Sequence, residues 1–173
     1  MEISVALSLV TALYTDDSEF GAAQRVKLAA LLAEKPSVPG IVERLVATPK
    51  SDGGFDWANS NITDANFPAT AEPSLEGARL DKIVGSKDYV LAELKRLGRR
   101  AATAAEGLLY GIKNPGEQRK YWIWCLAQVW LGPDGRYEYA VVLGVSDVGE
   151  RSASLDVVAS GVDAVERVLS FPL

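Results

Sequence analysis

The stretch "YWIWCLAQVWLGPDGRYEYAVV", residues 121–142, decides how the fold of this chain is interpreted. Two runs rich in aromatic and β-branched residues flank the tetrapeptide at 132–135. Proline and aspartate suit the centre of a turn there, and glycine suits its exit. We therefore predict an antiparallel β-hairpin. Alternate positions are apolar on both of its faces, which indicates a central hairpin covered on each side.

The turn also predicts a register for the hairpin. If Leu131 lies opposite Arg136, the cross-strand pairs on one face are Trp130 with Tyr137, Gln128 with Tyr139, Leu126 with Val141 and Trp124 with Leu143. Sheet faces that stack nucleobases interleave basic residues with the rings, and none occurs between residues 121 and 131. We therefore expect these rings to form core rather than a ligand surface, with Trp130 and Tyr137 near the turn as the exceptions.

The chain after the hairpin predicts one more strand and a helix. The segment "SASLDVVAS", residues 152–160, has the composition of a third strand. Ser160 and Asp163 are spaced as a capping box, which predicts a last helix through Leu169.

The strongest helical pattern lies before the hairpin, from Ser86 to about Ile112. Its apolar residues recur at intervals of four, three, four, three and four, namely Val90, Leu94, Leu97, Ala101, Ala104 and Leu108. We predict one long helix here, ended by "NPG" at 114–116.

The N-terminal third predicts further helices. Residues 1–14 fit a strand and a helix equally well, and this alternative stays open. Ser18 suits the start of a helix that ends at Pro36 and Pro39. A short helix over "GIVERLVAT", residues 40–48, is closed by Pro49.

Residues 50–74 follow neither period, so we predict a long irregular loop that is either functional or disordered. The whole chain of 173 residues is of a size typical of one domain. We therefore predict a single globular domain, residues 1–173, of the α+β class. Its N-terminal two-thirds would be helical, followed by a C-terminal antiparallel hairpin or three-strand meander and a terminal helix.

Composition excludes several kinds of chemistry. The sequence has no histidine, which removes Ser-His-Asp and Cys-His catalysis and nearly all zinc sites. Its single cysteine, Cys125, lies in the most apolar stretch, where a buried inert thiol is usual. We expect no cofactor and no bound metal. The sequence also lacks an apolar run long enough for a membrane helix and a secretion signal, so we expect a soluble, cytoplasmic protein without membrane contact.

Charge is distributed unevenly. The net charge is −5, yet residues 82–120 hold nine Lys and Arg against four Asp and Glu. On the predicted long helix, Lys95, Arg96, Arg99 and Arg100 fall opposite the apolar stripe. Such like charges repel each other, so we expect them to pair with carboxylates of the chain itself, with an acidic partner protein or with phosphate groups. Pairing within the chain, or plain solvation, is the favoured interpretation.

The loop at 50–74 is the other candidate site. Phe55 and Trp57 lie among polar residues, and exposed tryptophans are strong anchors in protein interfaces. The alternative is that these rings pack beneath the loop and hold it in place. The loop's Asp and Asn residues do not have the spacing of an EF-hand, so we do not assign a calcium site.

These observations lead to three functional hypotheses. The leading one is a non-enzymatic protein–protein interaction module, such as an adaptor, an inhibitor of immunity type or an assembly subunit, which binds another protein or a second copy of itself. Its candidate contact residues are Lys95, Arg96, Arg99, Arg100, Phe55 and Trp57. The first alternative is a carboxylate- or cofactor-dependent enzyme with a pocket near residues 50–74. The second is a nucleic-acid binder through the basic helix at 95–100, which the acidic composition disfavours.

Overall fold

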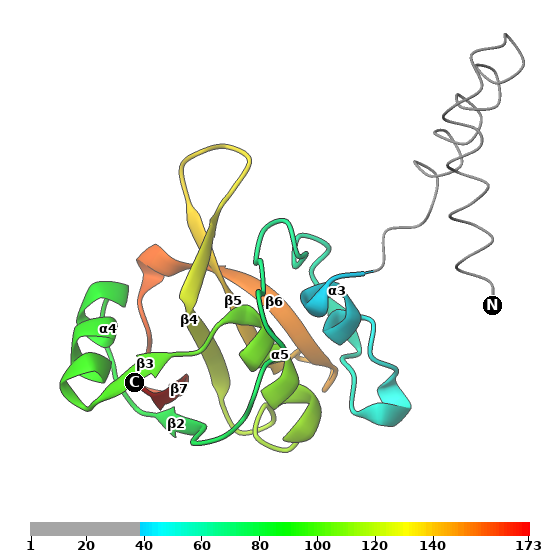
Figure 1. Ribbon diagram of the computed structural model, residues 1–173, viewed down its shortest axis with the longest axis horizontal. Coiled ribbons are helices and arrows are strands. Elements are labelled where there is room, and N and C mark those ends of the chain that lie inside the picture. Colours follow the sequence, from blue (N-terminus) through cyan, green and yellow to red (C-terminus); the bar gives the residue numbers. More distant parts are fainter. Residues whose placement is uncertain (1–38) are drawn as a thin grey trace, which may run out of the picture. The chain divides into compact units, whose positions relative to one another are not determined.

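The computed structural model describes residues 39–173, which fold around a seven-stranded mixed sheet (Figure 1). The strand order is β1 (Trp57–Ala58), β6 (Arg151–Val157), β5 (Glu138–Val145), β4 (Trp122–Leu131), β7 (Glu166–Pro172) and β2 (Arg79–Asp81), and β3 (Arg99–Ala101) also pairs with β7. The prediction of a helical N-terminal two-thirds followed by a hairpin or meander is therefore wrong, because strands begin near residue 57 and helices in the described part are short. The predictions for residues 1–14 and for a helix from Ser18 to Pro36 lie outside the described residues.

The elements follow the chain in this order: α3 Ile41–Val46, η1 Lys50–Asp52, β1 Trp57–Ala58, β2 Arg79–Asp81, α4 Lys87–Arg96, β3 Arg99–Ala101, α5 Ala104–Lys113, β4 Trp122–Leu131, β5 Glu138–Val145, β6 Arg151–Val157, η2 Val158–Ser160 and β7 Glu166–Pro172. The short helix α3 and the third strand β6 confirm the sequence predictions for those segments. The described helices include none that is both long enough and apolar enough to span a bilayer.

The hairpin of β4 and β5 is confirmed, but its predicted register is wrong. Trp124 lies opposite Val142 rather than Leu143, and Trp130 lies opposite Tyr139 rather than Tyr137. The offset changes between Cys125 and Trp130 because β4 is irregular there. Within that irregular part, Ala127 donates its N–H to the carbonyl oxygen of Ala102 (3.0 Å) instead of to β5. A single offset could not have placed both ends of the hairpin correctly.

The predicted long helix is two helices with a strand between them. Gly98, at φ +69°, ends α4 in a left-handed conformation that suits glycine, and β3 follows directly. Thr103 and Glu106 then form a complete capping box that begins α5. The apolar stripe is consequently divided between two cores, and Leu97, at the point of division, is exposed.

The predicted terminal helix is strand β7. Val168 packs into one core while its neighbour Leu169 packs into the other, which is the alternation of a central strand. The expected capping box does not form, because Glu166 accepts the hydrogen bond from the N–H of Asp163 (2.6 Å) and Ser160 donates to the carbonyl of Val157. β7 runs parallel to β4 and antiparallel to β2 and β3.

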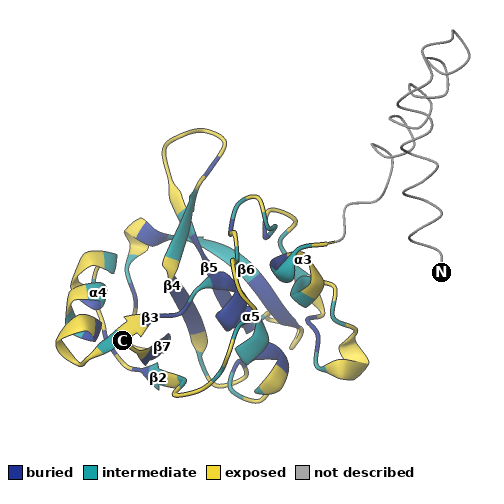
Figure 2. Cartoon of the chain, viewed as in Figure 1, coloured by how far each residue is buried: buried dark blue, intermediate teal, exposed yellow. Residues whose placement is uncertain are grey.

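Two apolar cores lie on the two faces of the sheet, since alternate residues of β4 enter different cores. We call them the α5 face and the α4 face. On the α5 face, sheet residues such as Ile123 and Val141 pack against α5, α3 and the 50–74 segment. On the α4 face, Trp124 and Val142 pack with Val90 and Leu94 of α4. Figure 2 shows the buried positions concentrated in the sheet and α5, whereas α4 is largely exposed.

The segment at 50–74 is mostly irregular, as predicted, but it is fixed to the rest of the fold. Its strand β1 pairs in parallel with β6. Phe55, Ile62 and Phe67 are buried in the core of the α5 face. The packing interpretation therefore holds for Phe55, whereas Trp57 is exposed.

Candidate functional site

The four basic residues proposed from the sequence do not share a helix. Lys95 and Arg96 lie at the end of α4, whereas Arg99 and Arg100 belong to β3. Arg96 donates two hydrogen bonds to Glu93, at 2.8 and 2.6 Å. That pairing lowers the pKa of Glu93 and raises the pKa of Arg96, mainly through the hydrogen bonds between them.

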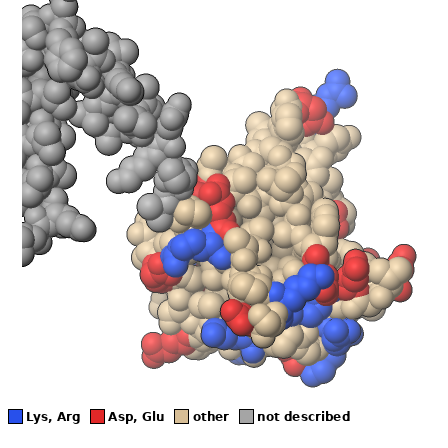
Figure 3. All heavy atoms as spheres, turned by 90° about the vertical axis from the view of Figure 1, so that its right-hand side faces the viewer, with Lys and Arg blue, Asp and Glu red and all other residues tan. Residues whose placement is uncertain are grey.

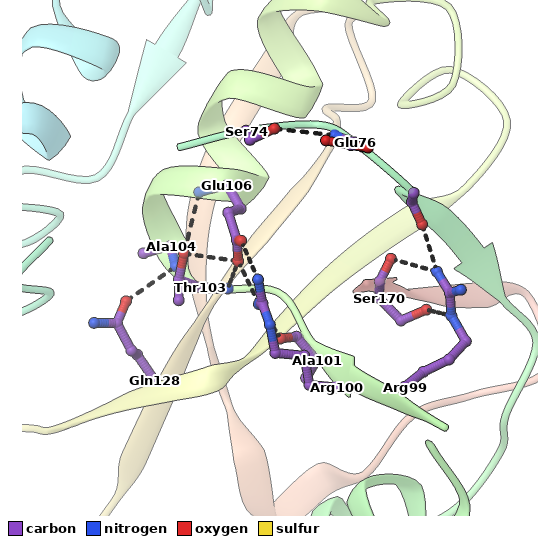
Figure 4. Close-up of polar contacts among 11 residues, drawn as sticks. Ser74, Glu76, Arg99, Arg100, Ala101, Thr103, Ala104, Glu106, Gln128 and Ser170 are labelled. Atoms are coloured by element: carbon purple, nitrogen blue, oxygen red, sulfur yellow. Dashed lines mark hydrogen bonds and ion pairs between the residues drawn. The ribbon is translucent and has the colours of Figure 1, made fainter. Parts of the chain in front are cut away.

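Arg100 is held by the start of α5 (Figure 4). Its guanidinium donates to both carboxylate oxygens of Glu106, at 2.9 and 2.6 Å, and lies 5.1 Å from the centre of the Phe171 ring. Burial pushes the pKa of Glu106 upward, but hydrogen bonds from Arg100 and Thr103 outweigh it and hold that pKa below its ordinary value. Glu106 therefore stays a charged, hydrogen-bonded carboxylate that fixes the β3–α5 junction.

Arg99 points away from Arg100 and ties β3 to other segments (Figure 4). Its side chain donates to the hydroxyl and carbonyl oxygens of Ser170, at 2.7 and 2.8 Å, and to the carbonyl of Gly77 at 2.7 Å. Asp81 lies 3.6 Å from its Nε. All three arginines thus have partners within the protein, and only Lys95 of the four makes no ion pair with a described residue. These contacts favour the pairing interpretation over a free basic stripe.

Other surface charges are paired in the same way. Arg44 contacts Glu72, and Lys50 lies 2.9 Å from Asp56. On the face that Figure 3 shows, Lys and Arg side chains lie close to Asp and Glu side chains rather than gathering into one basic patch. Such a surface gives little continuous attraction for a phosphate backbone.

A pocket of about 390 Å³ lies between residues 68–74 and the start of α5, where the enzyme hypothesis expected one. Glu72 and Glu106 are the carboxylates of its lining. Glu106 accepts bonds from Arg100 and from both the N–H and hydroxyl of Thr103, so its oxygens are already engaged. Its lowered pKa is also opposite to that of a general acid.

The single thiol is equally unsuited to chemistry. Burial strongly raises the pKa of Cys125, with a smaller contribution from Glu106. Its Sγ lies against Gly107 of α5. In residues 39–173, no three acidic or cysteine side chains cluster in a way that would hold a metal ion.

Two tryptophans of the sheet are exposed and form the remaining candidate site. Trp57 is 51% exposed and Trp122 is 41% exposed, although both belong to strands of the sheet. The register places Trp57 beside Ser152 of β6, and Ser152 beside Gly144 of β5. The ring of Trp122 lies over Gly144, within 3.1 Å of where a Cβ would be. We call Trp57, Ser152, Gly144 and Trp122 the tryptophan row.

The tryptophan row lies on the α4 face, because the next position of β4 on that face, Trp124, is part of its core. α4 covers Trp124 and Val142 but not the row, so the two outer rings are exposed beside a buried core. Three carboxylates lie on neighbouring segments, together with Arg119, which donates to the carbonyl of Gly149 in the β5–β6 turn. Glu166 of β7 is the register partner of Trp122, and exposed Asp147 and Glu150 lie in the β5–β6 turn.

Sequence reasoning proposed Trp57 but missed Trp122. The exceptions it chose from the hairpin were Trp130, which is half-buried, and Tyr137, which is exposed. The sequence feature that could have indicated Trp122 is Gly144, since a glycine inside a strand often marks close approach of a ring or another chain. Phe55, the remaining candidate, is buried beneath the guanidinium of Arg151, 5.5 Å from its ring centre.

Comparison with other proteins adds no functional assignment. No protein-family model matches the sequence, and neither the curated proteins nor the solved structures include a significant match.

Proposed function

We propose that this protein is a protein-binding module whose contact surface is the tryptophan row. The observation that carries the proposal is the pairing of two exposed tryptophans, Trp57 and Trp122, at the two ends of one cross-sheet row with small residues between them. Tryptophan is among the residues that contribute most to protein interfaces, because it buries a large rigid area at low entropic cost.

The spacing of the row indicates what segment it fits. Trp57 and Trp122 are separated by three strand-to-strand steps, across β6 and β5. At about 4.8 Å per step, their backbones lie about 14 Å apart. About four residues of an extended chain cover that distance, since each residue spans about 3.3 Å. A short extended segment could therefore contact both rings. Ser152 and Gly144 between them are buried, and the ring of Trp122 itself covers Gly144.

The charge around the row indicates the partner's chemistry. Glu166, Asp147 and Glu150 flank the rings, and the chain as a whole carries a net charge of −5. Indole faces attract ammonium and guanidinium groups, and nearby carboxylates add to this attraction. The partner segment should therefore carry basic side chains together with apolar ones. The same charges disfavour nucleic acid at this surface.

Binding of a model peptide tests the proposal. The probe is a peptide of about nine residues with alternating arginine and leucine, which is long enough to exceed the estimated span. Its reference is the peptide with glutamate in place of arginine. Isothermal titration calorimetry should show binding of the basic peptide only. The double variant Trp57→Ala/Trp122→Ala should weaken it by at least about tenfold, an amount typical of removing interface anchors.

The matched control is Tyr137→Ala, which removes an exposed ring of the hairpin outside the row. It should leave the affinity unchanged. Equal binding of both peptides, or an affinity that survives the double variant but not the control, would contradict the proposal.

A further inference from the structure

A small pocket on the α5 face combines aromatic rings with side-chain amides. Its volume is about 230 Å³, and its lining consists of Asn59, Asn61, Trp130, Pro133, Tyr139 and Leu155. Trp130 and Leu155 also pack against the core of the α5 face. The pocket therefore lies on the opposite side of the sheet from the tryptophan row and shares no residue with it.

Two contacting rings form one wall of this pocket. The ring centroids of Trp130 and Tyr139 are 5.8 Å apart, and their planes are inclined by 38°. Tyr139 reaches this position because Gly132 has no side chain, since a Cβ there would lie 2.8 Å from the tyrosine ring. Rings at this separation contact each other directly. With Pro133 beside them, they form one inclined apolar wall against which a compact ring can pack.

The two asparagines present mainly donors. Oδ1 of Asn59 accepts hydrogen bonds from both the backbone and the side-chain nitrogen of Asn61, at 2.9 and 3.2 Å. Within residues 39–173, this leaves both N–H groups of the Asn59 amide and one of the Asn61 amide without an acceptor. Of the two amides, the one acceptor that remains is Oδ1 of Asn61, and the hydroxyl of Tyr139 in the same lining can both donate and accept. A complementary ligand must therefore offer more acceptors than donors.

Size and charge narrow the ligand further. Pockets for whole small molecules are typically about 300–1,000 Å³, so this one is suited to a single side chain of a larger ligand. No charged side chain lines it, and a neutral occupant is therefore expected.

We propose that this pocket binds a proline ring of a polyproline II segment in a partner protein. Proline supplies a compact ring that packs against the wall formed by Trp130 and Tyr139, and it has no N–H of its own. A polyproline II chain has no internal hydrogen bonds, so its carbonyl groups are free to accept from Asn59 and Asn61. Aromatic-lined grooves recognise such segments at low entropic cost because the ligand is already extended. The inference goes beyond the proposed function, because it assigns a second site, with different chemistry, on the other face.

A sugar is the competing ligand for aromatic rings with amides. Sugar hydroxyls both donate and accept, so they need acceptors in the site as well as donors. The amides here present three free N–H groups against one side-chain oxygen. This balance favours carbonyl groups over hydroxyl groups.

The test uses the full chain labelled with ¹⁵N and an oligoproline peptide of about nine residues, which is three turns of polyproline II helix. The indole signal of Trp130 should shift on titration, and the signals of Trp57 and Trp122 should not. Asn59→Asp keeps the size of the side chain and the acceptor used by Asn61, but replaces the free donors with an acceptor. It should weaken binding by at least about fivefold, as expected for one lost hydrogen bond to a buried carbonyl.

Trp122→Ala is the matched control and should bind oligoproline as the original protein does. It separates this inference from the proposed function, because the same variant should lose the basic peptide. No shift of the Trp130 signal, full affinity in Asn59→Asp, or a shift produced by N-acetylglucosamine instead of oligoproline would each overturn the inference.

Discussion

Both faces of the sheet carry an apolar core, but the core on the α5 face is larger and is covered by more of the chain. On the α5 face, seven residues of α5 are buried, and α3 and the 50–74 segment complete the cover. On the α4 face, α4 buries only Val90 and Leu94, and its cover ends before the tryptophan row. Alternate residues of the same strands form the two faces. The functional candidate therefore lies at exposed rings beside the more thinly covered core, rather than where the sequence gathers its charges.

The two helices differ in how closely they approach the sheet. In α5, Gly107 lies against Cys125 of β4, and Gly111 lies against Gln118 and Leu143. Such approach leaves no room for side chains between helix and sheet. α4 instead carries lysine, arginine and glutamate over most of its surface, which is typical of an amphipathic surface helix.

The largest expected effect comes from the centre of the covered face. Leu108→Ala removes a fully buried side chain of α5 and should lower the free energy of unfolding by about 2–5 kcal/mol. Urea denaturation measures it. The control Tyr89→Ala, at an exposed position of α4, should change stability by no more than about 0.5 kcal/mol. Equal effects of the two substitutions would remove the distinction between a core helix and a surface helix.

A second substitution tests the close approach of α5 directly. A Cβ on Gly107 would lie 2.1 Å from Sγ of Cys125, so Gly107→Ala should destabilise by about 1–3 kcal/mol despite alanine's higher helix propensity. Adding Cys125→Ala removes that sulfur and should recover part of the stability that Gly107→Ala loses. Gly116→Ala, where no atom lies within 4 Å, is the control and should be nearly neutral. If the double variant is no more stable than Gly107→Ala, the contact with Sγ of Cys125 does not cause the loss of stability.

A smaller effect is expected at the junction between the faces. Glu106→Gln breaks the charged pair with Arg100 and weakens the capping box, and should cost about 1–2 kcal/mol at neutral pH. Because the pKa of Glu106 is lower in the folded protein than its ordinary 4.5, its contribution is fully present above that pH and is lost as the pH falls through the folded-state pKa. Stability curves of the two proteins should therefore converge in acid. Parallel curves down to low pH would contradict this assignment.

The smallest effect on stability should come from the tryptophan row. Trp122→Ala and Trp57→Ala should each cost no more than about 1 kcal/mol, because both rings are exposed. Trp124→Ala, two residues along the strand from Trp122, removes a ring that is 1% exposed and should cost about 3–5 kcal/mol. Similar costs at Trp122 and Trp124 would mean that the row is part of the core.

The sequence predicted local features better than their arrangement. The hairpin, β6, α3 and the end of α5 before "NPG" each followed from nearby residues. The helix predicted across 86–112 failed because its stripe continues through Gly98, so periodicity alone could not show that Val90 and Leu108 face different cores. The register failed first at the turn, which is longer than predicted, because Leu131 pairs with Glu138 rather than Arg136. It changed again between Trp130 and Cys125, where β4 is irregular. The tryptophan row depends on pairing between β1 and β6, which lie far apart in the chain.

The most direct test of the account follows the indole signals of the four tryptophans while the arginine–leucine peptide is added to the ¹⁵N-labelled protein. Single tryptophan variants assign the signals. The account predicts that the signals of Trp57 and Trp122 shift together along one saturation curve while that of Trp124 stays in place. Saturable binding that leaves both Trp57 and Trp122 unshifted would contradict the claim that the uncovered end of the α4 face is the protein-binding surface.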